Sequence, residues 1–154
     1  MKRLTTFIAT VAYSGYFPIF SGTFGTIPAW VLAWFLFKNP LAMAAAAVAA
    51  TAVSVWSAGL AEAVLGHDSK KIVIDEWAGM FISLLFLPAR LDVFIAGFLF
   101  FRFYDVIKPY PADRCERLPG GWGVTFDDVF AGVYANLTCQ IGVAALRHLH
   151  WFGF

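Results

Sequence analysis

Apolar residues in this chain occur in long blocks rather than at alternate positions, and this pattern predicts helices. The blocks span residues 27–37, 41–65, 76–87, 92–107 and 129–146, with polar segments between them. Block 41–65 is long enough to cross a bilayer, which takes about 20 apolar residues. Blocks 27–37 and 76–87 are shorter, so we expect these helices to be tilted or sheltered by neighbours. The pattern therefore predicts an all-α bundle of about five helices.

Composition places this bundle in a membrane. The chain is 60% hydrophobic and 14% charged, whereas soluble domains are about 45–50% apolar and about 25% charged. Its 154 residues suit one domain, and no linker divides them. A net charge of +1 offers no electrostatic basis for binding nucleic acid. Cys115 and Cys139 stand in no metal-binding spacing, so we expect free thiols.

The start of the chain, "MKRLTTFIATVAYSG", has two basic residues and a short apolar run, as a signal peptide does. Threonines interrupt that run, so we do not interpret it as a leader.

Charge predicts which ends of the helices share a side of the membrane. If all five helices cross and the N-terminus is cytoplasmic, segments 1–26, 66–75 and 108–128 lie together on the cytoplasmic side. These segments carry Lys2, Arg3, Lys70, Lys71, Lys108, Arg114 and Arg117, against Lys38, Arg90 and Arg147 on the other side. This distribution follows the positive-inside rule. The same arrangement brings every polar cluster of the chain to one face.

Two predicted helix starts share a pattern. "DEWAGMF" begins at Asp75 and "DVFAGVY" at Asp128, and each has Ala-Gly three residues later. One acid at a helix start is explained by capping. A second adjacent acid, Glu76 or Asp127, adds repulsion, and clustered carboxylates are what a hard divalent cation requires. The Ala-Gly pairs are typical of close helix packing in membranes, which would bring the two acidic starts together.

Other polar residues have a structural interpretation beside a functional one. Arg102, Asp105 and Lys108 recur every three residues, which suits a salt-bridge ladder as well as a metal and phosphate site. Segment 21–28, "SGTFGTIP", is predicted to be a loop opening a helix, with Thr26 as its cap and a possible anion site. His67 either orients a phosphate or is a solvated loop residue.

These motifs together resemble a known family. "HDSKKIVIDEWAGM", "FRFYDVIKPYP", "GGWGVTFDDVFAG" and "FPIFSGTFGTIPAW" resemble, in order and spacing, segments of the phosphatidylglycerophosphatase A family across residues 15–135. Ser21 stands where the family more often has proline. The resemblance implies a multi-pass protein of the bacterial inner membrane with a cytoplasmic active face. The implied reaction is Mg²⁺-dependent hydrolysis of phosphatidylglycerophosphate to phosphatidylglycerol and phosphate, in phospholipid biosynthesis.

The residues expected to carry this reaction form three sets. The metal set is Asp75, Glu76, Asp105, Asp127 and Asp128, and the catalytic set is Asp75, Asp105, Asp127, Asp128 and Lys108. The phosphate-binding set is Thr23, Gly25, Thr26, His67, Arg102 and Lys108.

Two mechanisms and one other function remain open at this stage. The nucleophile is either water or a carboxylate that forms an acyl phosphate. A membrane cation transporter or channel would also carry clustered acids, but at mid-membrane depth along a route to both sides. The expected partners are a membrane phospholipid and the bilayer, without nucleic acid, and the sequence leaves the oligomeric state open.

Overall fold

The computed structural model describes residues 2–19, 21–66 and 69–149, and these residues form helices and no strand. In chain order the elements are α1 (Lys2–Ala9), η1 (Ser14–Tyr16), α2 (Ser21–Leu36), α3 (Pro40–Leu65), α4 (Asp75–Ser83), α5 (Leu91–Ile107), α6 (Ala112–Cys115) and α7 (Gly121–His148). The all-α prediction is confirmed, and its five blocks correspond to α2, α3, α4, α5 and α7. Pattern alone had not indicated α1 and α6.

Two of the helices begin earlier than the sequence predicts. α2 begins at Ser21 and α7 at Gly121, so both glycine-rich segments expected as loops are helical. Each glycine costs a helix about 1 kcal/mol relative to alanine, which favoured the loop prediction. Packing reverses that preference: a Cβ on Gly121 would lie 2.0 Å from the Val55 carbonyl oxygen of α3. The prediction that Thr26 and Asp128 cap their helices is therefore wrong, because both lie inside a helix.

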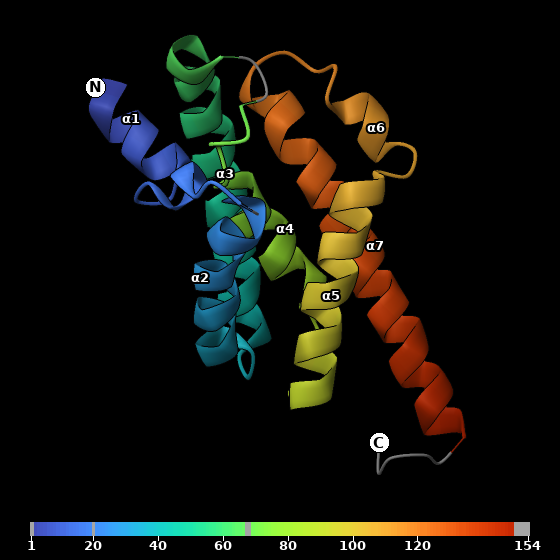
Figure 1. Cartoon of the computed structure of the whole chain (residues 1–154). Helices are drawn as coiled ribbons and strands as arrows, with labels where there is room; N and C mark the ends of the chain where they lie inside the picture. The colour runs from blue at the N-terminus through green and yellow to red at the C-terminus, as the bar shows by residue number, and fades with distance from the viewer. Residues whose placement is uncertain (1, 20, 67–68, 150–154) are drawn as a thin grey trace.

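The shortest of the five main helices lies at the centre of the bundle. α4 has 9 residues and packs against α2, α3, α5 and α7. Figure 1 shows α4 between the α2–α3 pair on one side and α5 with α7 on the other. Most of its side chains are buried, including Met80 and Phe81. The expectation that a short helix is sheltered by its neighbours is confirmed.

The crossing of α4 and α7 depends on two glycines. A Cβ on Gly132 would lie 2.4 Å from the carbonyl oxygen of Gly79, and a Cβ on Gly79 would lie 2.6 Å from that of Asp128. Neither helix tolerates a side chain here, so the backbones approach closely, as the paired Ala-Gly motifs predict. Asp75 and Asp128 each precede their glycine by four residues. Both acids therefore lie one turn, about 6 Å along the axis, from the crossing point.

Two helices, α3 and α7, are long and apolar enough to cross a membrane. Most of their apolar surface faces outward, with Val48 71% exposed and Ile141 70% exposed. Large apolar side chains exposed in this way match an environment of lipid tails. The turns at 37–39 and 84–90 lie at one end of the bundle, and the connections 66–74 and 108–120 lie at the other (Figure 1).

The glycine crossing yields a direct stability test. We expect Gly132→Ala to lower the thermal unfolding temperature in detergent, because overpacking costs about 1–3 kcal/mol. Gly142→Ala is the matched control on the same helix, since a Cβ there meets nothing within 4 Å. The control should unfold at the same or a slightly higher temperature. Equal effects of the two substitutions would contradict the close crossing.

Candidate functional site

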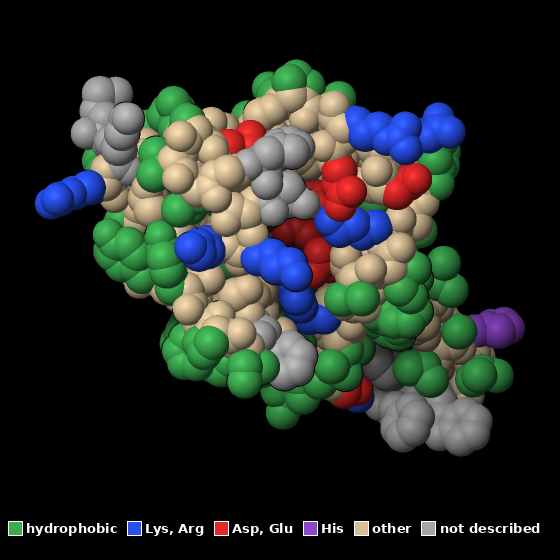
Figure 2. All heavy atoms as spheres, turned by 45° about the horizontal axis from the view of Figure 1, so that its top comes forward, with side chains coloured by type: hydrophobic (Ala, Val, Ile, Leu, Met, Phe, Trp, Pro, Cys, Tyr) green, Lys and Arg blue, Asp and Glu red, His purple; other side chains and the backbone are tan. Residues whose placement is uncertain are grey.

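A polar cavity of about 530 Å³ opens at the end of the bundle that holds the segments 69–74 and 108–120. Figure 2 looks onto this end and shows acidic side chains deep in a hollow, with Lys and Arg side chains around it. The cavity is lined by Ser21, Gly22, Ser69, Lys70, Ile72, Asp75, Glu76, Arg102, Asp105, Val106, Lys108, Asp127 and Asp128. All five acids of the predicted metal set therefore line one cavity, and the predicted convergence of polar clusters is confirmed.

The acidic side chains form the floor of the cavity, below the loops that form its rim, because the acids lie some way along or below the ends of the neighbouring helices. Asp127 and Asp128 lie six and seven residues into α7, about 9–10 Å along its axis from Gly121. Residues 69–74 run down the bundle before α4 begins at Asp75 (Figure 1). Asp127 is 7% exposed and Asp128 is 3% exposed.

Asp75 and Asp128 are the two acids on this floor that form no ion pair with any residue the structure describes. Burial raises the pKa of Asp75 well above its ordinary value, and the negative charges of Glu76, Asp127 and Asp105 raise this pKa further. Buried carboxylates close together are unfavourable as anions unless a positive charge joins them. Among the described residues, no cation lies within ion-pair distance of these two carboxylates, and Arg102 interacts with Asp128 only at longer range.

Arg102 neutralises two of the other acids. Its Nη1 lies 2.9 Å from Glu76 Oε2 and 2.8 Å from Asp105 Oδ2. The contact with Asp105 is the predicted pairing along one helix face, and the contact with Glu76 joins α5 to α4. Glu76 also accepts a short hydrogen bond from the Thr26 hydroxyl of α2. One guanidinium thus holds the acidic ends of α4 and α5 together.

Lys108 does not continue the helical ladder. It ends α5 in a left-handed conformation with φ of 48°, which turns its side chain toward α7. Its Nζ lies 2.7 Å from Asp127 Oδ2 and forms a second, short ion pair with Glu116. Burial lowers the pKa of Lys108, but its hydrogen bonds and charge interactions with Asp127 and Glu116 outweigh burial and raise this pKa. The ammonium therefore stays protonated at neutral pH.

The predicted phosphate-binding segment reaches the cavity through different residues. Ser21 and Gly22 line the cavity, whereas Thr23, Gly25 and Thr26 do not. Gly25 and Thr26 are buried, and the Thr26 hydroxyl faces Gly22 and Glu76. This difference follows from the early start of α2, which turns Gly25 and Thr26 into the bundle, while Thr23 is half-buried outside the cavity lining. The assignment of these three residues to phosphate binding stays a prediction.

The sequence analysis did not select four residues with polar side chains at the site, and it selected one residue that lies outside the described part of the chain. The four are Glu116, Ser69, Lys70 and Ser21. Lys70 had counted only toward membrane topology, and Glu116 has no sequence signal because it reaches Lys108 from a different segment. His67 falls outside the described residues, so its role stays a prediction.

No group of three or more His, Cys, Asp or Glu side chains among the described residues is arranged closely enough to enclose a metal ion. The acids share a cavity, but Glu76, Asp105 and Asp127 are held by cations. The pair available for a metal ion is Asp75 with Asp128.

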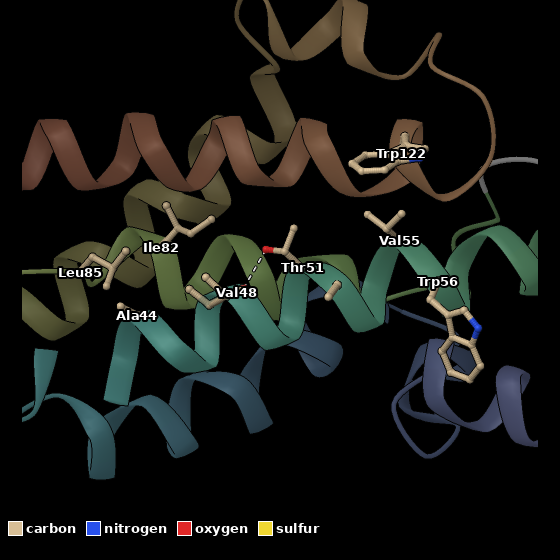
Figure 3. Close-up of a pocket in the computed structure, with 10 residues that line it drawn as sticks. Ala44, Val48, Thr51, Val55, Trp56, Ile82, Leu85 and Trp122 are labelled. Carbon is tan, nitrogen blue, oxygen red and sulfur yellow. Dashed lines mark hydrogen bonds between the residues drawn. The ribbon is translucent and has the colours of Figure 1, made fainter. Parts of the chain in front are cut away.

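A second hollow differs in chemistry. This apolar groove of about 640 Å³ lies between α3, α4 and α7, and Figure 3 shows Trp56 and Trp122 near one end and Leu85 near the other. The Thr51 hydroxyl in the groove donates to the Ala47 carbonyl oxygen at 2.8 Å, so it has no need of a ligand. With no charged side chain in its lining, the groove is not a phosphate site.

Comparison with known proteins identifies the family. The sequence matches the family model described as "PgpA: Phosphatidylglycerophosphatase A" over residues 7–143. The chain belongs to the phosphatidylglycerophosphatase A family. With its two long apolar helices, this membership makes it a membrane protein.

Three named proteins are similar in sequence to this member of the family. A phosphatidylglycerophosphatase A of Escherichia coli K12 is 37% identical over 90% of this chain and 80% of its own length. One of Haemophilus influenzae is 42% identical over 45% of this chain and 44% of its own length. A Bacteroides thetaiotaomicron protein, provisionally named a phosphatidylinositol-3-phosphatase, is 36% identical over 92% of this chain and 96% of its own length. No solved structure matches.

The Arg102–Glu76 ion pair is testable by substitution. We expect Arg102→Met to destabilise the fold by about 3–5 kcal/mol, because it leaves Glu76 buried without its partner. Arg90→Met is the control: it removes the exposed pair with Asp92, and exposed pairs contribute little. Thermal unfolding in detergent measures both. The double variant Arg102→Met/Glu76→Gln should recover part of the loss, and no recovery would contradict a direct interaction.

Proposed function

We propose that this protein is a Mg²⁺-dependent phosphatase that hydrolyses phosphatidylglycerophosphate to phosphatidylglycerol and phosphate in phospholipid biosynthesis. The observation that carries the proposal is that Asp75 and Asp128, on the floor of a cavity ringed by basic side chains, form no ion pair with any described residue. A phosphate monoester brings negative charge to such a cavity only together with a cation. Membership of the family and the names of the E. coli and H. influenzae relatives support the substrate.

The donor set suits Mg²⁺. This ion usually binds through one or two carboxylates together with water and substrate phosphate oxygens, rather than in a cage made entirely of protein. Asp75 and Asp128 would supply the two carboxylates, with Asp127, Glu76 and Asp105 around them. When bound, Mg²⁺ supplies positive charge to phosphate oxygens and lowers the pKa of bound water.

The remaining residues orient and balance charge. Arg102 keeps Glu76 and Asp105 in place and offers further N–H groups toward the cavity. Lys108 holds Asp127 and carries a permanent positive charge at the cavity edge. Fixed cations of this kind stabilise the charge on a transferring phosphoryl group. Lys70, on the rim, adds positive charge where an anionic headgroup enters.

The nucleophile is either water or a carboxylate, and trapping of a covalent intermediate distinguishes them. If an aspartate attacks phosphorus, it forms an acyl phosphate, and borohydride reduces this group to an alcohol that mass spectrometry detects. If water attacks phosphorus directly, no side chain is modified by borohydride during turnover.

The Bacteroides relative provides a second candidate substrate, phosphatidylinositol 3-phosphate. Both lipids carry a phosphate monoester beyond the phosphodiester of the headgroup, so the same site would accept that group. They differ in the polar part that joins the two phosphates: a glycerol or the larger inositol ring. Comparing rates on the two lipids in the same mixed micelles tests the choice, and we expect faster hydrolysis of phosphatidylglycerophosphate.

The geometry disfavours a cation transporter or channel. The five acids that line the cavity gather toward one end of the bundle. Two other cavities along the bundle, between α3 and α7 and between α5 and α7, have mainly apolar linings. A cation that reached the acids would find no polar route onward there.

Neutralising the two carboxylates that form no ion pair with a described residue should abolish activity. We expect Asp75→Asn and Asp128→Asn to lose more phosphate release than the about 10–100-fold typical of mutating outer-shell partners of a metal. Asp92→Asn is the matched control, because Asp92 is exposed at the opposite end of α5. Adding a chelator to the wild type should give the same loss, and Mg²⁺ should reverse it. Full activity of either variant would refute the proposed site, and full activity in chelator would refute the metal.

We further propose that the chain crosses the bacterial inner membrane several times with its acidic cavity on the cytoplasmic face. The excess of basic residues near the cavity end supports this orientation. In a Cys115→Ala/Cys139→Ala background, an impermeant maleimide applied to intact spheroplasts should label Lys38→Cys. It should label Arg117→Cys only after the membrane is opened. The reverse pattern would invert the topology.

A further inference from the structure

In the N-terminal segment, polar side chains face the bundle and large apolar side chains face outward, the opposite of a surface helix on a water-soluble protein. In α1, the bundle buries Thr5 and Thr6, which are 4% and 9% exposed. The outward side presents Leu4 and Phe7, which are 60% and 45% exposed. A helix normally turns its apolar side inward. The environment outside α1 must therefore be one that favours apolar side chains.

The outward apolar surface continues past α1. Tyr13, Tyr16, Phe17 and Ile19 are each 45–63% exposed. The rings form edge contacts, with centroids 5.6 Å apart for Phe7 and Tyr13 and 5.7 Å apart for Tyr13 and Tyr16. Phe17 stacks on Phe24 of α2 at 4.1 Å, and below it the exposed Ile27, Val31 and Phe35 form a stripe down that helix. The segment is thus continuous with the apolar outer surface of the bundle.

This segment does not cross the bilayer. Its 8 helical residues extend about 12 Å, well short of the about 30 Å of a hydrocarbon core. The chain then reverses through Val11, Ala12 and Tyr13, which all have positive φ, at 46°, 53° and 67°. Figure 1 shows α1 slanting across the cavity end of the bundle, whereas α2 and α3 run down it.

Charge indicates which part of the bilayer this segment meets. No acidic residue precedes Glu62 in the sequence, and α1 carries Lys2 and Arg3. Basic residues beside an apolar face are typical of helices that lie at the surface of a membrane with anionic lipid. Aromatic residues, Tyr in particular, also concentrate at the headgroup level.

The same segment is hydrogen-bonded to, and packed against, the loop at the rim of the acidic cavity. The Ala9 carbonyl oxygen accepts hydrogen bonds from the Val73 and Ile74 amides at 2.9 and 3.2 Å. Ile74 immediately precedes Asp75. A Cβ on Gly15 would lie 2.1 Å from the Lys71 carbonyl oxygen, and the Lys71 ammonium lies 4.9 Å from the Tyr16 ring centroid. Any displacement of the segment would therefore move the loop that carries Lys70 and leads into Asp75.

We propose that residues 3–19 form an interfacial anchor that lies in the headgroup region of an anionic bilayer and holds the cavity-rim loop 69–74 at that level. The anchor, which packs on α3 and α2, sets how far the cavity mouth lies from the phosphate plane. This inference depends on the protein residing in a membrane and not on its being a phosphatase.

Spin-label depth measurements test the position of the anchor. Leu4→Cys, Phe7→Cys and Phe17→Cys are labelled in a Cys115→Ala/Cys139→Ala background and reconstituted in phosphatidylcholine vesicles with phosphatidylglycerol. Val48→Cys is the deep reference and Arg117→Cys the aqueous one. We expect all three anchor labels within about 5–10 Å of the headgroup boundary, as for other interfacial helices.

Three results would overturn the position. Labels as accessible to a water-soluble relaxant as Arg117→Cys would leave the segment in solvent, and labels as deep as Val48→Cys would make it part of the spanning bundle. Labels shielded from both oxygen and the water-soluble relaxant would place it against a second copy of the chain. Identical depths in vesicles of phosphatidylcholine alone would refute the role of anionic lipid.

Hydrogen exchange tests whether the anchor holds the rim loop in place. Phe7→Asp places a carboxylate in the anionic interface, so the amides of Val73 and Ile74 should lose protection. Phe7→Trp is the matched control, because Trp favours the interface, and protection should be retained. Unchanged protection in Phe7→Asp, with the wild-type anchor at interfacial depth, would refute the coupling alone. Neither measurement uses phosphatase activity, so its outcome is separate from that of the proposed function.

Discussion

The close crossing of α4 and α7 is the constraint on which the rest of this structure depends. Gly79 and Gly132 allow the two backbones to touch, and each helix carries an aspartate one turn before its glycine. Each aspartate precedes its glycine by four residues, and no side chain separates the two helices at the crossing. Asp75 and Asp128 therefore reach the same cavity. A single pair of side chains larger than hydrogen at the crossing would move these carboxylates apart.

The site around this crossing separates acids held by protein cations from acids left without them. Arg102 compensates Glu76 and Asp105, and Lys108 compensates Asp127. The Arg102–Glu76 pair links α5 to α4, and the Lys108–Asp127 pair links the end of α5 to α7, so both also fix the walls of the cavity. Asp75 and Asp128 form no ion pair with a described residue, and the proposed metal ion and phosphate would be bound beside them. Structural and chemical roles are thus divided between neighbouring residues of the same type.

The membrane explains why so polar a site can exist in so apolar a chain. In lipid, the large side chains on the outer faces of α3 and α7 need no partner, and small residues are used where helices touch. The polar residues are consequently free to gather at one end, where the cavity opens. The N-terminal segment obeys the same principle with its threonines inward and its leucine and phenylalanine outward.

The sequence by itself determined the helical class, the five main helices and the residue types of the site. Apolar blocks and acid pairs are local features, and the repeated Asp-x-aromatic-Ala-Gly pattern even indicated which two helices meet. The predicted start of α7 was wrong because its glycines favoured a loop. The close packing of Gly121 against α3 outweighs the low helix propensity of glycine.

Only the tertiary structure decided how the charges are paired. Glu116 reaches Lys108 from another segment, and Arg102 reaches Glu76 across helices 26 residues apart in sequence. The same holds for Thr26, which turns inward because α2 begins at Ser21. Such contacts depend on helix rotation and on the left-handed turn at Lys108, and no pattern along the chain encodes either. Pairing, and hence which two acids remain available for a cation, follows from packing in three dimensions.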